Sequence, residues 1–351
     1  MAVTDVSDAP VRETKRIEFD RFPRVGLCHR PTPIEAMPRL TEHLGGPTLF
    51  IKRDDCTGLA TGGNKTRKLE FLLGDALRQN AEMIVTQGAV QSNHVRQTAA
   101  AACRSGLKCH VLLERRVPDR RPDYETTGNV FLDDLFGTTY EFRPAGLDMN
   151  AEAEAVTKEF RAKGQRPYFI PGGGSNAVGA LGYAQCAQEI ADQCQASGQR
   201  FDWLVMGTGS TGTQAGLVAG FHAMGYDLPV MGISVRQPRE RQVHAVHATT
   251  SKTLELLSEA PINPTKIHVD DGYVGAGYGL PAESTYEAIA LAARQEGILL
   301  DPVYSAKGMA GLIGLVRAGF FKPEDSIVFL HTGGATALFA YEDEIKNYLD
   351  A

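Results

Sequence analysis

Short apolar runs alternate along the chain with longer segments whose apolar residues recur at helical spacing. Segments 69–79, 94–106 and 286–297 have the period of amphipathic helices. Strands that alternate with helices along a chain pair in parallel, with helices on both faces of the sheet. We therefore expect an α/β fold of doubly wound parallel sheets, with buried strands at residues 48–52, 83–88, 109–114, 167–173, 203–209, 230–235 and 327–334.

The loops that follow these runs hold most of the chain's clusters of glycine, serine, threonine and asparagine. In doubly wound sheets the loops at the carboxyl ends of the strands gather around the ligand. The sequence therefore predicts a ligand site built from several of these loops. Between the runs we expect a charged helix at 152–165 and a polar loop at 115–125, and no Ser/Gly-rich linker divides the chain. We therefore expect the chain to cross between domains more than once.

The length, net charge and hydropathy of the chain exclude several classes of protein. A chain of 351 residues is too long for one ordinary core, so we expect two domains or one large α/β domain. The net charge of −6 argues against a nucleic-acid-binding face. No apolar run is long enough to cross a bilayer, and residues 1–20 are polar without the apolar core of a signal peptide. We expect a cytoplasmic protein with no nucleic-acid and no membrane partner.

The cysteines and histidines do not have the spacing of a metal site. No two cysteines form a C-x-x-C pair, and no two histidines stand at metal-ligand spacing, so we expect no metal. In a reducing cytosol most of the thiols, Cys56 included, are expected to be free and to fill small core spaces. The six cysteines are at positions 28, 56, 103, 109, 186 and 194.

A loop of glycines and hydroxyl residues, GTGSTGT at 207–213, lies between an expected strand and a helix. Backbone N–H groups at a helix start bind anions such as phosphate. The loop fits the dinucleotide pattern G-x-G-x-x-G, but the next strand ends in Val235-Arg236, without the acidic residue that binds a ribose. A terminal phosphate monoester suits this loop better than a dinucleotide does. The alternative is that the loop only caps the helix. The hydroxyl residues are Thr208, Ser210, Thr211 and Thr213.

Lys65 follows a flexible turn, Gly62-Gly63-Asn64, at the expected start of a helix. The positive end of the helix dipole, together with the nearby cations Arg67 and Lys68, favours the neutral form of the Lys65 amine. A lowered pKa is what a lysine needs to form an imine with an aldehyde. By spacing alone, such a basic cluster is more typical of a solvated surface.

The loop TQGAVQSNH at 86–94 also joins a strand to a helix. Gln91, Ser92, Asn93 and His94 are candidates for hydrogen bonds to a carboxylate or a ring hydroxyl at that helix start. Ser92 is equally well placed as a helix N-cap, and His94 is equally well explained by packing.

The motifs GGNKTRKLEFL, QSNH, GTGSTGT and HTGG together resemble the fold-type-II pyridoxal-phosphate enzymes, the tryptophan synthase β-like superfamily. Within it, the chain is similar to the branch of aminocyclopropane-carboxylate deaminase, D-cysteine desulfhydrase and L-cysteate sulfo-lyase, from about residue 20 to 340. The resemblance implies pyridoxal 5'-phosphate as cofactor, a small amino-acid substrate and a homodimer. We expect a large cofactor-binding domain of residues 1–62 and 173–351 and a small domain of residues 63–172.

The resemblance also implies roles for individual residues. Lys65 matches the Schiff-base lysine, Asn93 the residue that bonds the cofactor's ring hydroxyl, and Ser92 a contact to the substrate carboxylate or a second acid/base; His94 is a further substrate-binding candidate. The segment Thr208, Gly209, Ser210, Thr211, Gly212 and Thr213 matches the phosphate cup. Tyr278 and Tyr304 match two tyrosines on the substrate side of the ring, and Ser305 and Thr332 lie where the family contacts the pyridine nitrogen.

The residue at position 305 helps to choose between the reactions of this branch. The deaminase branch carries a glutamate there, so Ser305 leaves a weaker electron sink that suits β-elimination of a good leaving group. We expect L-cysteate as substrate, giving pyruvate, sulfite and ammonium; the alternative is D-cysteine, giving hydrogen sulfide in place of sulfite. Other classes are an NAD-dependent oxidoreductase, the cyclopropane deaminase and a non-catalytic amino-acid-binding module. Candidate donors to a sulfonate are Thr57, Thr61, Ser175, Asn176 and Arg236.

Overall fold

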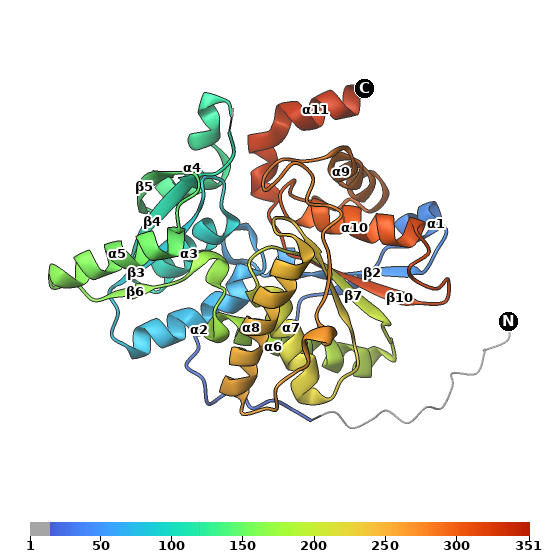
Figure 1. Ribbon diagram of the computed structural model, residues 1–351, viewed down its shortest axis with the longest axis horizontal. Coiled ribbons are helices and arrows are strands. Elements are labelled where there is room, and N and C mark those ends of the chain that lie inside the picture. Colours follow the sequence, from blue (N-terminus) through green and yellow to red (C-terminus); the bar gives the residue numbers. More distant parts are fainter. Residues whose placement is uncertain (1–14, 119) are drawn as a thin grey trace.

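Two separate sheets organise the chain in the computed structural model, which describes residues 15–118 and 120–351 (Figure 1). The N-terminal segment that we expected to be polar lies, up to residue 14, outside the described residues. The larger sheet has the order β1 (Ile34–Ala36), β2 (Thr48–Arg53), β10 (Ser326–His331), β7 (Trp203–Thr208), β8 (Val230–Ser234), β9 (His268–Asp270). The smaller sheet has the order β5 (Thr139–Pro144), β4 (Lys108–Arg115), β3 (Met83–Ala89), β6 (Pro167–Phe169).

Every strand pair is parallel except β1 with β2, so the predicted α/β class with doubly wound parallel sheets is confirmed. The connecting helices are α1 (Pro38–Leu44), α2 (Lys65–Arg78), α3 (Asn93–Arg104), α4 (Gly128–Leu135), α5 (Met149–Ala162), α6 (Ala177–Ser197), α7 (Gly212–Met224), α8 (Arg239–Leu257), α9 (Glu283–Glu296), α10 (Ser305–Arg317) and α11 (Glu342–Asp350).

Alternating side chains along each strand fill a core on each face of its sheet. In β7, Leu204 and Met206 pack with α6, α7 and α8, whereas Val205 packs with α9 and α10 on the other face (Figure 1). In β3, Ile84 points to α3 and Val85 to α5. Burial on both faces explains why the strands read as continuous apolar runs in the sequence.

The chain passes from the larger sheet to the smaller one after β2 and returns after β6. Helices α2 and α6, which flank these two crossings, pack against each other. We propose that the two sheets are the cores of the two domains expected from the sequence, with the boundaries at residues 62 and 173.

Several expected elements differ from the observed ones at their ends. The strand expected at 167–173 ends at Phe169, because a 3-10 turn of Gly172–Gly174 follows, and the one expected at 327–334 ends at His331. The helix start expected at Lys65, after the Gly62-Gly63-Asn64 turn, is where α2 begins. Strands β1, β5 and β9 were not predicted, because they are edge strands without a continuous buried apolar run: β1 and β9 have three residues each, and the residues of β5 are half-exposed or exposed.

The cysteines are free thiols, but only half of them fill core space as expected. Cys109, Cys186 and Cys194 are buried, whereas Cys56 and Cys103 are exposed, so the expectation of packing was wrong for these two. Within the ranges that the structure describes, no helix combines the length and apolar character of a membrane span.

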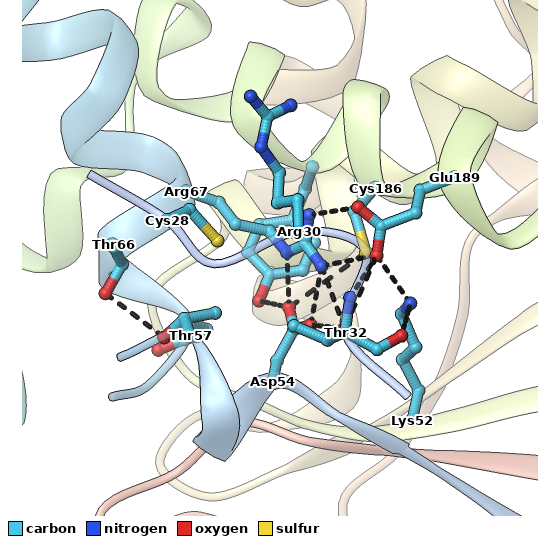
Figure 2. Close-up of polar contacts among 12 residues, drawn as sticks. Cys28, Arg30, Thr32, Lys52, Asp54, Thr57, Thr66, Arg67, Cys186 and Glu189 are labelled. Atoms are coloured by element: carbon cyan, nitrogen blue, oxygen red, sulfur yellow. Dashed lines mark hydrogen bonds and ion pairs between the residues drawn. The ribbon is translucent and has the colours of Figure 1, made fainter. Parts of the chain in front are cut away.

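A buried ionic network joins the first turn of α2 to the larger sheet (Figure 2). Arg67 is 1% exposed and donates from Nε and Nη2 to the two carboxylate oxygens of Asp54, each at 2.8 Å. Its Nη1 donates to Glu189 on α6 at 3.0 Å. Lys52 donates to the same Glu189 at 2.6 Å, so two cations and two anions are enclosed together.

Two neighbouring cations, together with hydrogen bonds, hold Asp54 in its charged form although it is fully buried. Burial alone would raise the pKa of this carboxyl, but Arg67, Lys52 and the Tyr183 hydroxyl bring the pKa below its ordinary value. Tyr183 donates to Asp54 at 2.6 Å. A buried pair of this kind is costly to break, because the remaining partner is left as an uncompensated charge.

Replacing Arg67 with Met should therefore lower the free energy of unfolding by about 3–5 kcal/mol. Urea denaturation followed by circular dichroism measures this change. The matched control is Arg78→Met at the other end of α2, where the arginine side chain is 65% exposed and pairs with Asp75. This variant should lower the free energy of unfolding by less than about 1 kcal/mol. Equal losses in the two variants would contradict the structural role of Arg67.

Candidate active site

A cavity of about 250 Å³ lies where the carboxyl ends of strands from both sheets converge. Its walls include the end of β3, the residues directly after β4, β6, β7 and β8, and the starts of α2 and α3. A second, smaller cavity adjoins it, and Lys65, Asn93 and Tyr304 line both. The predicted ligand site at the strand ends is therefore present as a hollow in the structure.

Lys65 is the first residue of α2 and is 7% exposed. The turn before it uses left-handed backbone angles, with φ of 72° at Gly62 and 127° at Gly63. A side chain at Gly62 would meet the Asp55 carbonyl oxygen at 1.9 Å, so the turn requires glycine there. The Lys65 Nζ donates to Asn64 Oδ1 at 2.7 Å and lies 5.7 Å from the centre of the Tyr304 ring.

Burial lowers the pKa of Lys65 to about 8. Asp301 opposes this shift, and the Arg96 cation adds to it. Arg67, which was expected to add to this shift, is not among its causes; the Arg67 guanidinium is paired with Asp54. The alternative of a solvated basic surface is wrong, since Lys65, Arg67 and Lys68 are all buried.

The hydroxyl-rich loop reaches the same cavities as Lys65. Gly209 and Ser210 line both cavities, Thr211 lines the larger and Thr213 the smaller. The loop ends at the start of α7, whose free backbone N–H groups favour an anion. Thr208 lies behind the loop and accepts from Gln242 Nε2 at 3.0 Å, and the Gly212 N–H donates to Ser175 Oγ at 3.0 Å.

The start of α3 supplies a second set of polar groups. Ser92 caps the helix by accepting from the Val95 N–H at 3.2 Å, and it lines the cavity as well. Asn93 Oδ1 accepts from Arg96 at 3.2 Å and from Asn129 at 3.0 Å. With its oxygen held in this way, the Asn93 amide presents its N–H groups, for which no protein partner is found in the described part of the chain.

His94 lines the cavity but is engaged elsewhere through both ring nitrogens. Its Nε2 lies 2.8 Å from Thr86 Oγ1 and its Nδ1 3.4 Å from Thr98 Oγ1. Burial, with Lys65 and Lys68 adding to the effect, brings the pKa of His94 well below its ordinary value. The ring is therefore neutral, and its expected role toward a substrate stays a prediction.

Tyr278 and Tyr304 form one wall of the larger cavity. Their hydroxyls are 3.1 Å apart, with Tyr304 donating to Tyr278, and their rings meet edge to face with centres 5.7 Å apart. Burial raises the pKa of both phenols, so both stay protonated at neutral pH. The wall therefore offers hydroxyl groups that can donate or relay a proton.

Ser305 and Thr332 lie in different places. Thr332 lines the smaller cavity. Ser305 is fully buried and lines neither cavity; its hydroxyl donates to Asp301 Oδ1 at 2.7 Å and accepts from the Asp301 N–H at 2.7 Å. The expected contact of Ser305 with a cofactor ring stays a prediction.

Of the five residues expected to bind a sulfonate, only Ser175 and Arg236 line the cavity. Thr57 donates to the Gly63 carbonyl, Asn176 caps α6, and the hydroxyl of Thr61 pairs with that of Thr336. These three were wrong candidates because they shape the turns next to the site. The sequence analysis also missed Gln87, Asn150 and Arg116. Arg116 lies two residues after the strand expected at 109–114 and directly after β4, and the gathering of ligand sites at strand carboxyl ends would have pointed to it.

Comparisons with known proteins agree with this geometry. The profile of the family described as "Pyridoxal-phosphate dependent enzyme" matches residues 25–333. A protein from Klebsiella pneumoniae subsp. pneumoniae named D-cysteine desulfhydrase is 47% identical over 328 residues, which cover 93% of this chain and 98% of that protein. A crystal structure of an ACC deaminase homologue has 36% identity and a TM-score of 0.85, covering 93% of this chain and 97% of the other.

A more distant structure shows the fold alone. A crystal structure of O-ureido-L-serine synthase has 15% identity and a TM-score of 0.63, and the alignment covers 89% of this chain and 92% of that one. The shared arrangement therefore extends across proteins whose sequences have diverged widely.

The lowered pKa of Lys65 makes a prediction for the ligand-free protein. Only the neutral amine reacts with an acylating reagent, so labelling of Lys65 should rise with pH through a midpoint near 8. At pH 8 a lysine of ordinary pKa has less than about 1% of its amine neutral, whereas about half of Lys65 should be neutral. Peptide mapping by mass spectrometry after brief labelling measures each site. A midpoint above 10 would show that burial does not neutralise this amine.

Proposed function

Because the chain belongs to the family of pyridoxal-phosphate dependent enzymes, we propose that it is a lyase that eliminates hydrogen sulfide from D-cysteine, leaving pyruvate and ammonium. The observation that carries this proposal is the 47% identity to a protein named D-cysteine desulfhydrase across nearly the whole length of both chains. L-Cysteate, the substrate expected first from the sequence, has no comparable support, so D-cysteine takes its place. Family membership also removes the interpretation of residues 207–213 as a dinucleotide site.

The residues around the cavity fit pyridoxal phosphate. The start of α7, with Gly209, Ser210 and Thr211, would hold the phosphate through backbone N–H groups and hydroxyls. The N–H groups of Asn93, whose oxygen is held by Arg96 and Asn129, would bond an oxygen on the ring. Lys65, buried between these two features, would make the covalent link, since its lowered pKa favours the neutral amine. When bound, the cofactor withdraws electrons from the α-carbon of an amino acid and so acidifies its hydrogen.

In this proposal Lys65 moves the proton. The Lys65 amine removes the α-hydrogen, and the electron pair of the C–H bond becomes the second bond between the α- and β-carbons. The bond from the β-carbon to sulfur breaks, and its electron pair leaves with the sulfur as hydrosulfide. The remaining 2-aminoacrylate takes up water and a proton to give pyruvate and ammonium.

Tyr278, Tyr304 and Ser92 would guide the proton and the leaving group. The two phenols are neutral and joined by a hydrogen bond of 3.1 Å, so a proton given up at one hydroxyl can be replaced through the other. Ser92, at the start of α3, would orient the substrate carboxylate. Together with Lys65, these residues place acid/base groups on more than one side of the cavity.

The assembly expected from the resemblance, a homodimer, stays a proposal. Phe131 and Leu135 on α4 are 56% and 67% exposed, and Phe339, in the 3-10 segment Ala335–Tyr341 that packs against α4, is 65% exposed. Such a cluster of exposed apolar side chains is typical of a contact between subunits.

The substrate proposal is tested by supplying D-cysteine, L-cysteine, L-cysteate and the cyclopropane amino acid separately to the holoenzyme. D-Cysteine should yield sulfide and pyruvate in equal amounts. Sulfite from L-cysteate without sulfide from D-cysteine would show that the substrate is L-cysteate, as first expected from the sequence. Release of 2-oxobutanoate from the cyclopropane amino acid would indicate the deaminase instead.

Replacing Lys65 with Ala should abolish turnover and the visible absorption of the bound cofactor, because both depend on its amine. Absorption spectra and sulfide release measure the two effects. Lys108→Ala, at the exposed start of β4, is the control and should retain both. Full turnover in the Lys65 variant would exclude Lys65 as the group that links the cofactor.

A further inference from the structure

The larger cavity has two arginines on its walls, Arg116 and Arg236, which the proposed cofactor contacts do not use. None of its lining residues within the described ranges is an aspartate or a glutamate. Two helix starts face it as well, those of α3 and α7. A bound phosphate and a substrate carboxylate would occupy the two helix starts, which leaves Arg116, on a different wall, without an assigned ligand group.

Arg116 is fixed on the wall formed by Tyr278 and Tyr304. Its guanidinium carbon lies 4.8 Å from the centre of the Tyr278 ring, a cation–π contact. Its Nε donates to Glu114 Oε2 at 2.8 Å, and its Nη2 bonds to the same oxygen. For Nη1 no hydrogen-bond partner is found among residues 15–118 and 120–351, and the side chain keeps 18% of its surface exposed. One edge of the guanidinium is thus held in place, and the other is available to a ligand.

A continuous line of contacts runs from Lys65 to Arg116. Lys65 Nζ lies 5.7 Å from the Tyr304 ring centre, the Tyr304 hydroxyl donates to that of Tyr278 at 3.1 Å, and Arg116 stacks on Tyr278. If Lys65 acts at the α-carbon, a group further along this wall faces the substituent on the β-carbon. The guanidinium stays charged at any physiological pH and is suited to meeting an anion.

We propose that Arg116 is a specificity-determining residue that faces the β-substituent of the substrate and stabilises it as it leaves as an anion. This inference rests on the proposed elimination reaction. When the carbon–sulfur bond breaks, both electrons go to sulfur, and the hydrosulfide carries the negative charge that Arg116 meets. A fixed donor aimed at charge that develops during a reaction contributes about 10²–10³-fold to the rate.

The test compares two leaving groups that differ in their need for stabilisation. Chloride leaves readily as an anion, whereas hydrosulfide is a poorer leaving group. Arg116→Met should lower kcat/KM for D-cysteine by about 100–1,000-fold and that for 3-chloro-D-alanine less than threefold, so the ratio of the two should fall at least about thirtyfold. The kcat/KM of Arg116→Lys for D-cysteine should lie between the values of Arg116→Met and the original chain, because lysine keeps the charge but lacks the planar, forked guanidinium.

Arg115→Met is the matched control. Arg115 is the neighbouring residue of the same type, but it lies on the surface, where it pairs with Glu125 at 2.6 Å. Arg115→Met should leave kcat/KM unchanged for both D-cysteine and 3-chloro-D-alanine. Cofactor absorption and thermal melting of each variant show whether it folds and binds the cofactor.

A binding measurement separates Arg116 from the reaction itself. D-Aspartate carries an anionic β-substituent that does not leave, and D-alanine carries none. Calorimetric titration of the holoenzyme should show D-aspartate binding weakened about tenfold by Arg116→Met, one charged contact of about 1.4 kcal/mol, with D-alanine changed less than twofold.

The outcomes distinguish the two proposals. Equal losses for D-cysteine and 3-chloro-D-alanine, together with unchanged D-aspartate binding, would overturn the role of Arg116 while leaving the lyase intact. If the original chain released no sulfide from D-cysteine, the proposed function would fail. The D-aspartate titration would then still decide whether Arg116 faces the β-substituent.

Discussion

The buried ion pair between Arg67 and Asp54 is the interaction on which the site depends most. It fixes the first turn of α2 against the end of β2, and Lys65 lies two residues before Arg67 on the same turn. A helix transmits displacement as a rigid body, so any movement of this pair would move the Lys65 amine relative to the loop at 207–213. The geometry of the cavity is therefore maintained by charges on residues that do not line it; Figure 2 shows the contacts among these charges.

Burial has one consistent effect on the groups around the cavity: it favours their uncharged forms. The amines of Lys65 and Lys68 have lowered pKa values, the phenols of Tyr278 and Tyr304 raised ones, and the His94 ring is neutral. The lining groups that keep their charge are the arginines, which cannot lose a proton at these pH values. The site thus separates proton-transfer groups, which are neutral and can exchange protons, from fixed cations, which can only attract anions.

The elements that could be predicted from the sequence are those whose pattern is local. Strands buried on both faces, such as β3 and β7, are continuous apolar runs, and the Gly62-Gly63 turn marks the start of α2. Edge strands such as β5 were missed because their residues are half-exposed and carry no such run. The cause of the lowered pKa of Lys65 was also misjudged, because the pairing of Arg67 with Asp54 exists only in the folded structure. The influence of Asp301 on Lys65 likewise depends on the fold, and no local pattern in the sequence indicates it.

The cavity joins segments that are distant along the chain: Asn64 Nδ2 donates to Thr213 Oγ1 at 2.9 Å across 149 positions. Closing a loop of this length costs conformational entropy that the rest of the fold must offset, so the pocket is a property of the folded chain and is absent from the unfolded one. A cofactor that binds only there shifts the folding equilibrium by mass action, by about 2.7 kcal/mol at a hundred times its dissociation constant. The concentration of free cofactor would then govern how long each newly made chain persists against proteolysis, as well as whether it is active.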